Sequence, residues 1–516
     1  MLFNSYEFLF AFFPVAIAAY RLFGRSQDGR AAVLLAASIA FYASWDWRFL
    51  ALLLPSIFVN YGLGTILRRS MASGRHGFAD AILAVGVILN LLVLGVFKYA
   101  GFVVANVNAL AGTDYVLARI ILPLGISFFT FEQIGFLIDL RRGHPYRLNL
   151  LRYAVFVAFF PRLVAGPILR YGEIVPQLER EGRAPGLAAD LAVGLSIFAI
   201  GLAKKALLAD GISPFVAPNF DAAASGQPLD LFMAWGGALA YTCQLYFDFS
   251  GYSDMAIGAA RCFGIRFPQN FNSPYKSTSI IEFWRRWHMT LSRFLRDYLY
   301  IPLGGNRRGR IRRYANLLIT MVLGGLWHGA NWTFLAWGAL HGSYLMVNHA
   351  WDATASRSRS VAAFRASRAG RAFGYAITCL AVVVAWVFFR APTFHAGWAV
   401  LGGMAGLHGV VLPSAVADHL QPLVPAFAAL GIRIGGSGTQ FIDTWLWIAA
   451  LLGLAFLAPN TQEILARGHP TLEHPVHPPK RLRWSESPAW AVAAGMTAFL
   501  GVLSVTRGSV FLYWQF

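Results

Sequence analysis

Residues 314–342 read YANLLITMVLGGLWHGANWTFLAWGALHG, an apolar run with a histidine near its centre. At about 1.5 Å per helical residue, His328 lies about 21 Å along a helix from Tyr314, well inside a hydrocarbon layer about 30 Å thick. An ionisable side chain at that depth is costly and marks a candidate functional residue. The run therefore predicts a membrane-embedded element and nominates His328 as a catalytic residue.

Apolar stretches of similar length recur along the whole chain. Of its 516 residues, 57% are hydrophobic and 13% are charged, whereas roughly a quarter are charged in an average soluble domain. We count about 11 stretches long enough to cross a bilayer, each about 20 residues long. The predicted fold class is an all-α polytopic membrane protein with additional re-entrant and interfacial helices.

The net charge of +19 is distributed as short basic runs between the apolar stretches. Basic loops of this kind lie on the cytoplasmic side, so the N-terminus is predicted to face outward. We attribute the charge to topology and to contact with anionic lipids, and we expect no binding of nucleic acid. The basic runs are residues 21–30, 68–76, 141–152, 276–313, 357–371 and 467–483.

Three segments depart from a simple helical crossing. Residues 153–169 lie between two basic runs and contain two prolines, which predicts a re-entrant segment. Residues 246–265 are a second candidate for a broken helix, with Asp248 and Asp254 facing a polar cavity; the alternative is hydrogen bonding between neighbouring helices. Residues 408–444 predict a long external loop with one interfacial helix.

Residues 279–312, SIIEFWRRWHMTLSRFLRDYLYIPLGGNRRGRIR, begin with aromatic and arginine side chains at helical spacing. This pattern predicts one amphipathic helix in the cytoplasmic interface of the membrane. His288 lies on the edge of its apolar stripe, four residues after Trp284.

The residues next to His328 in the sequence favour a catalytic role for it over a purely structural one. Gly329 permits close backbone approach, Trp327 and Trp332 supply aromatic walls, and Asn331 is expected to orient a ring nitrogen. A neutral imidazole in an apolar site accepts a proton from a hydroxyl, as acyl transfer requires. The alternative is a histidine that only joins helices by hydrogen bonds.

A metal site is the other chemical interpretation, with His288, His328 and His341 as possible ligands. The sequence has no HExxH pair, and His288 and His328 fall on different predicted elements, so we expect no metal. His341 is interpreted as a packing residue, and the alternative is a functional role. The three cysteines, Cys243, Cys262 and Cys379, form no CxxC pair and are expected to be buried small hydrophobes.

At this point the sequence resembles the membrane-bound O-acyltransferases, and within them the alginate O-acetyltransferase branch. The family is marked by a histidine in a hydrophobic stretch and an upstream Asn or His, here His328 and His288. The resemblance extends over nearly the whole chain and is carried by these motifs in order: SYEFLFAFFPV, LPLGISFFTFEQIGFLID, FFPRLVAGPI, YFDFSGYSDMAIG, FPQNFNSPY, RRWHMTLSRFLRDYLYIPLGGNR, WHGANWTFLAWGALHG, WVFFRA and PNTQEI.

The resemblance implies that residues 1–516 form a single transmembrane domain in the inner membrane. Its motifs would lie in about 120–350, and further helices in 371–516. A funnel would admit a cytoplasmic acyl thioester, acetyl-CoA or a similar donor, and no bound cofactor is expected. An acceptor would arrive from the other side. The expected partners are a periplasmic SGNH-hydrolase-like acetyltransferase and the machinery that synthesises and exports a polysaccharide.

We expect His328 to act as general base and His288 to hold the donor or relay the proton. The candidates for lining the cavity are Asp248, Asp254, Trp284, Tyr298, Trp327 and Asn331. The candidates for attracting donor phosphates are Lys276, Arg285, Arg286 and Arg307, although such side chains also meet lipid headgroups. The rival interpretations are a proton-coupled transporter or lipid flippase, and a non-catalytic scaffold for polysaccharide export.

Overall fold

The computed structural model describes residues 1–118, 120–180, 187–473, 479, 481–505 and 511–512. Within these ranges nearly all regular structure is helical, and the strands are limited to one parallel pair, β1 (Val411–Leu412) with β2 (Arg433–Ile434). Cys243 and Cys262 are buried as predicted, whereas Cys379 is partly exposed. The prediction of an all-α polytopic membrane protein is confirmed.

Five helical stretches of the described residues are long and apolar enough to cross a membrane. The helix Leu231–Cys262 is also long, and it carries the buried charged residues Asp248, Asp254 and Arg261. The predicted count of about 11 crossings stays a prediction. The five stretches are Gln27–Ala72, His76–Ala111, Ala188–Ala224, Arg368–Arg390 and Gly438–Leu457.

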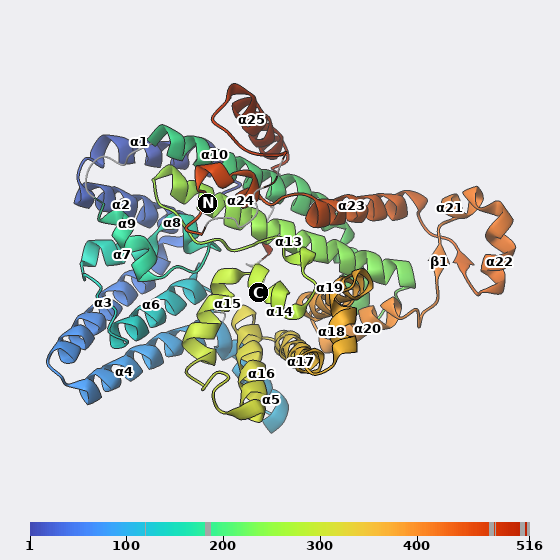
Figure 1. Cartoon of the computed structure of the whole chain (residues 1–516), viewed down its shortest axis with the longest axis horizontal. Coiled ribbons are helices and arrows are strands. Elements are labelled where there is room, and N and C mark those ends of the chain that lie inside the picture. Colours follow the sequence, from blue (N-terminus) through green and yellow to red (C-terminus); the bar gives the residue numbers. More distant parts are fainter. Residues whose placement is uncertain (119, 181–186, 474–478, 480, 506–510, 513–516) are drawn as a thin grey trace.

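The first third of the chain forms the blue and cyan part of Figure 1, in which α3, α4 and α6 pack against one another. Its helices are η1 (Glu7–Phe12), α1 (Phe13–Phe23), α2 (Gln27–Asp46), η2 (Trp47–Phe49), α3 (Leu50–Ala72), α4 (His76–Leu94), η3 (Gly95–Tyr99), α5 (Ala100–Ala111) and α6 (Ile126–Arg141).

The segment predicted to be re-entrant is broken, as expected. It consists of α7 (Leu150–Ala158) and α8 (Phe160–Leu163), followed by non-helical chain up to α9 (Tyr171–Leu178). The Tyr171 hydroxyl donates to the Arg147 carbonyl oxygen at 2.6 Å, so the two ends of the segment meet. The buried Arg162 guanidinium donates to the Phe156 and Val157 carbonyl oxygens at the break and pairs with the buried Glu132 carboxylate. These contacts satisfy backbone groups that the break leaves without helical partners.

The middle of the molecule is the long helix α13, which packs along α10 (Figure 1). The elements here are α10 (Leu187–Ala203), η4 (Lys204–Ala209), α11 (Asp210–Ile212), η5 (Ser213–Phe215), α12 (Ala217–Ala224) and α13 (Leu231–Cys262). A Cβ on Gly201 would lie 2.6 Å from the Gly251 carbonyl oxygen, so the contact between the two helices requires glycine.

The prediction that residues 246–265 form a broken helix is wrong, because α13 runs unbroken through Cys262. Its buried carboxylates are satisfied by side chains of neighbouring elements. Lys205 Nζ lies 2.7 Å from an Asp248 oxygen, and Lys204 Nζ lies 2.6 Å from an Asp254 oxygen. The alternative prediction for this segment, polar contacts between neighbouring helical elements, agrees with these ion pairs.

The apolar run quoted above forms a hairpin of two helices, α16 and α17, beside α14 and α15 (Figure 1). The elements of this part are η6 (Pro274–Lys276), α14 (Ile280–Arg286), α15 (Met289–Leu295), η7 (Arg296–Tyr300), α16 (Gly309–His328) and α17 (Trp332–Ala355).

The C-terminal part contains the excursion predicted as an external loop. Residues 408–444 hold two short helices, α21 and α22, and the β1–β2 pair, where we expected one interfacial helix; α21 and α22 lie at the far right of Figure 1. The elements are α18 (Arg359–Ala366), α19 (Arg368–Arg390), α20 (Phe394–Met404), α21 (Ser414–His419), η8 (Gln421–Leu423), α22 (Val424–Ala429), α23 (Gly438–Leu457), α24 (Thr461–Ile464), η9 (Ala466–Gly468) and α25 (Pro488–Leu503).

Candidate active site

His328 is the last residue of α16, and local backbone geometry ends the helix there. Gly329 is extended at φ −162° and ψ 151°, and a Cβ on it would lie 2.1 Å from the Phe334 ring. The carbonyl groups at the end of α16 have partners from η3: Lys98 Nζ donates to Trp327 O at 2.6 Å and to His328 O at 3.0 Å. These bonds satisfy carbonyl groups that have no hydrogen-bond partner within the helix, and they hold the end of α16, which carries His328, against η3.

The His328 imidazole is 5% exposed and is enclosed by aromatic rings. Its ring centroid lies 4.9 Å from that of Trp327 and 5.1 Å from those of Trp337 and Phe389. Trp332, which we expected beside it, is 53% exposed and donates to Asn106 at 2.9 Å. The imidazole thus lies in an apolar environment, which favours its neutral, proton-accepting form.

His288 interrupts the predicted amphipathic helix, and the prediction of one continuous helix is wrong. The residue has φ +41° and ψ 53°, a left-handed conformation that separates α14 from α15. The Met289 N–H donates to the backbone carbonyl oxygen of Asn270 at 2.9 Å. His288 Nδ1 lies 3.1 Å from the side-chain oxygen of Asn270, Oδ1. A strained backbone held by specific contacts is typical of functional sites.

The two histidines lie against the same indole ring. The Trp327 ring centroid is 6.2 Å from that of His288 and 4.9 Å from that of His328. His288 is fully buried, and Phe249 packs edge-on against it at 4.8 Å. The structure therefore brings the two predicted catalytic residues and Trp327 together from two separate parts of the chain.

Trp284 and His341 form the next layer of this aromatic cluster. The Trp284 indole N–H donates to His341 Nδ1 at 3.3 Å, and the Trp337 ring lies 5.1 Å from His328 and 4.8 Å from His341. His341 therefore packs behind Trp337. Within the described ranges, no group of three or more histidine, cysteine, aspartate or glutamate side chains lies close enough to hold a metal ion.

The predicted cavity residues Asp248 and Asp254 contact the C-terminal part of the chain. Asp254 accepts hydrogen bonds from the Thr461 hydroxyl at 2.6 Å and the Gln462 amide at 2.7 Å, and Asp248 accepts from the Leu512 N–H at 3.1 Å. Both carboxylates are therefore members of buried networks of ion pairs and hydrogen bonds.

Asn331 also has a structural role. It caps α17, because its Oδ1 accepts from the Thr333 N–H at 3.1 Å, and its Nδ2 donates to the Pro392 carbonyl oxygen at 3.0 Å. The expected bond to a ring nitrogen of His328 is not among these contacts.

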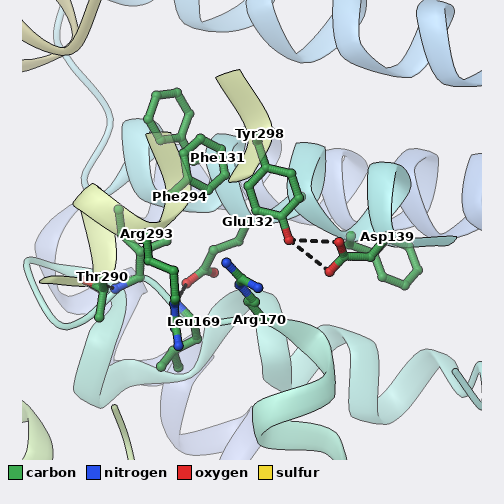
Figure 2. Close-up of a pocket in the computed structure, with 12 residues that line it drawn as sticks. Phe131, Glu132, Asp139, Leu169, Arg170, Thr290, Arg293, Phe294 and Tyr298 are labelled. Atoms are coloured by element: carbon green, nitrogen blue, oxygen red, sulfur yellow. Dashed lines mark hydrogen bonds between the residues drawn. The ribbon is translucent and has the colours of Figure 1, made fainter. Parts of the chain in front are cut away.

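Tyr298 lines a small pocket together with Glu132 and Asp139 of α6 (Figure 2). Its hydroxyl lies 2.9 Å from both carboxylate oxygens of Asp139, and Arg170 and Arg293 line the same pocket. Thr290, which also lines it, bonds Asn270 and so connects this pocket to His288.

Asp297 lies beside this pocket, where it pairs with Arg170 and Arg296. Partial burial raises the pKa of Asp297, but hydrogen bonds from Arg296 and Arg170 outweigh it, and the pKa lies below its ordinary value. The Arg170 guanidinium is in turn held over the Tyr298 ring, 5.4 Å from its centroid. This carboxylate therefore stays ionised and fixes Arg170 at the rim of the pocket.

The four predicted phosphate-binding residues fall into two groups. Lys276 donates to the Ala458 carbonyl oxygen at 2.7 Å, and Arg286 pairs with Glu282 at 2.9 Å. Arg285 and Arg307 are exposed on the side of the basic runs. The first two are tied into the fold, and the last two are available to solvent.

Sequence reasoning missed Asn270 and Lys98. A lysine inside the apolar stretch of residues 76–111 was a visible signal, because an ionisable residue at membrane depth marks a functional region. Asn270 lies within the motif FPQNFNSPY, but its bond to His288 spans 18 residues and needs the fold.

Comparisons with known proteins identify the family of the chain. Residues 125–389, which include both histidines, match the membrane-bound O-acyltransferase family, MBOAT. "Probable alginate O-acetylase AlgI" of Azotobacter vinelandii is 44% identical over 409 residues, 78% of each chain. "Peptidoglycan O-acetyltransferase" of Helicobacter pylori is 40% identical over 440 residues, 80% of this chain and 81% of the relative.

A more distant relative is named for a different acyl group. "Teichoic acid D-alanyltransferase" of Streptococcus thermophilus is 30% identical over 280 residues, 52% of this chain and 68% of the relative. The relatives therefore share acyl transfer and differ in the group and acceptor that their names state. The chain thus belongs to the membrane-bound O-acyltransferase family and is an O-acyltransferase.

Proposed function

We propose that this protein moves an acetyl group from a cytoplasmic acyl thioester, acetyl-CoA or a similar donor, through the inner membrane for O-acetylation of an exported, alginate-like polysaccharide. The observation that carries the proposal is the buried pair His288 and His328, both packed against Trp327, within the matched residues 125–389. Similarity to relatives named for alginate and peptidoglycan acetylation supports a polysaccharide acceptor.

The proposed chemistry needs one proton acceptor and an apolar chamber. His328 removes the proton of an acceptor hydroxyl, whose oxygen attacks the thioester carbonyl carbon. The tetrahedral intermediate collapses, the carbon–sulfur bond breaks, and the thiolate leaves and takes up the proton, relayed through His288. Exclusion of water by Trp327, Trp337 and Phe389 limits hydrolysis of the thioester.

The donor is proposed to enter from the basic side. Arg285 and Arg307 are exposed there and supply positive charge for the phosphates of a CoA thioester. The pocket that Arg170, Arg293 and Tyr298 line also contacts Thr290, which bonds the Asn270 that holds His288. We propose that the thioester arm follows this direction toward the histidines.

On its periplasmic side, the protein is proposed to bind an SGNH-hydrolase-like acetyltransferase. This partner completes transfer of the acetyl group to the polysaccharide as part of the export machinery. Because the acetyl group and the acceptor approach from opposite faces, the enzyme couples acyl transfer to movement across the bilayer.

The experiment uses inverted membrane vesicles from cells that make the polysaccharide. Radiolabelled acetyl-CoA is added outside the vesicles, on the cytoplasmic face, and label in alkali-labile esters of enclosed polysaccharide is counted. We expect label with the wild-type protein and background with His328→Ala at equal protein level. Equal labelling by both proteins would contradict the proposal, as would failure of the wild-type protein to transfer label from acetyl-CoA or any other acyl thioester.

A further inference from the structure

Asn270 lies between α13 and α14 and is fully buried beside His288. Its Oδ1 lies 2.8 Å from the Thr290 hydroxyl and 3.1 Å from His288 Nδ1, and its Nδ2 donates to the Ser253 hydroxyl at 2.8 Å. One amide therefore joins α13, the strained residue His288 and the first turn of α15.

Two independent contacts fix which end of the amide faces His288. The Thr290 hydroxyl oxygen accepts the Ile168 N–H at 3.0 Å, and the hydroxyl donates its own hydrogen to Asn270 at 2.8 Å. The Thr290 N–H, which can only donate, points at the same Asn270 atom at 3.4 Å. The atom that receives these hydrogens is the carbonyl oxygen, Oδ1.

The protonation of the His288 ring follows from this assignment. An amide oxygen only accepts hydrogen bonds, so the ring nitrogen 3.1 Å away must carry the hydrogen. In a neutral imidazole the other nitrogen then holds the lone pair. A separate bond holds His288 beside this amide, because the Met289 N–H donates to the backbone carbonyl oxygen of Asn270 and His288 has φ +41°.

We infer that Asn270 is a positioning residue that locks His288 in its Nδ1–H tautomer, so that His288 takes part in acyl transfer as a proton acceptor through Nε2. The inference rests on the proposed function and deepens it. A residue that relays the proton of the acceptor hydroxyl needs a nitrogen lone pair to receive that proton. The hydrogen-bond partner that orients a catalytic histidine sets which ring nitrogen carries the lone pair.

The test compares Asn270→Asp with a matched variant, Asn90→Asp. Asn90 is also a buried asparagine, and its Nδ2 donates to Asn60 Oδ1 at 2.6 Å between α4 and α3. The carboxylate introduced at position 270 keeps the acceptor but adds a negative charge that favours the imidazolium, so the acid limb of the pH profile of acetyl transfer from acetyl-CoA moves to higher pH. Asn270→Leu is expected to lower kcat at least tenfold with little change in the KM for acetyl-CoA.

An unchanged acid limb in an active Asn270→Asp protein, or the same shift in Asn90→Asp, would overturn the inference. A second measurement needs no folded variant at position 270. Solid-state ¹⁵N NMR of the wild-type protein in membranes, with the His288 signal assigned by its loss in His288→Gln, should show a protonated Nδ1. A protonated Nε2 would contradict the inference, whereas absence of acetyl transfer by the wild-type protein would instead contradict the proposed function.

Discussion

Gly329 ends α16 directly after His328 and packs against the aromatic residues beside it. It follows the histidine in an extended conformation, and its α-carbon faces the Phe334 ring so closely that a methyl group would lie 2.1 Å from a ring atom. Phe334 is buried and packs on Phe389, which itself contacts His328. Any side chain at position 329 must therefore move the aromatic wall of the site.

Gly329→Ala should preserve membrane insertion but reduce acetyl transfer. A displacement of about 1 Å at a reacting group costs on the order of a hundredfold in rate, and we expect a loss approaching that size. The matched control is Gly453→Ala in α23, where an added Cβ meets nothing within 4 Å, and which should keep full activity. Full activity of Gly329→Ala would show that this contact does not set the site.

At the scale of elements, the break after α7 is held by one buried arginine. Arg162 bridges the freed carbonyl groups of Phe156 and Val157 and the carboxylate of Glu132 on α6. Both members of this ion pair are fully buried. A buried charge that loses its partner is far more costly than a buried pair that is replaced as a whole.

Arg162→Met should therefore destabilise the protein by roughly 3–5 kcal/mol, because Glu132 becomes an unpaired buried charge. Adding Glu132→Gln removes that charge, and the double variant should recover part of the loss. The measurement is thermal unfolding in one detergent at fixed pH. A double variant no more stable than Arg162→Met would show that the ion pair is not the main role of Arg162.

The sequence was sufficient to predict the helical class, the break in the segment of residues 153–169 and the apolar setting of His328, because hydropathy, proline positions and intramembrane ionisable residues are local signals. It was insufficient at His288 and at α13. Nothing local distinguishes a continuous amphipathic helix from one broken at His288, since the break depends on Asn270. Likewise the carboxylates of α13 pair with Lys204 and Lys205 of another element, a contact that is not visible in the local sequence.

On the scale of the whole molecule, the chain is organised by the side of the membrane on which each loop lies. The basic run of residues 276–313 predicts the cytoplasmic side for the loop before α16. The basic runs 357–371 and 467–483 predict the same side for the start of α19 and for the chain after α23. These two helices flank the excursion that contains β1 and β2. Both flanking helices are long enough to span the bilayer, so this excursion is expected on the opposite side.

Cysteine labelling tests this sidedness. In a Cys379→Ala background, Ser414→Cys should react with an impermeant maleimide in intact spheroplasts, because Ser414 is exposed in α21. Asn306→Cys, exposed in the basic loop, should react only after the membrane is opened. Cys243 and Cys262 are buried and serve as internal blanks. Reaction of both positions in intact spheroplasts would contradict the predicted topology.

The central claim is that His328, placed by α16 in an aromatic chamber beside His288, carries out acyl transfer. The most direct measurement is the acetyl ester content of the exported polysaccharide in a deletion strain that carries either the wild-type protein or His328→Ala, at equal membrane levels. We predict that the wild-type protein restores the ester and that His328→Ala does not. Full restoration by His328→Ala would contradict the claim and favour a transporter or scaffold.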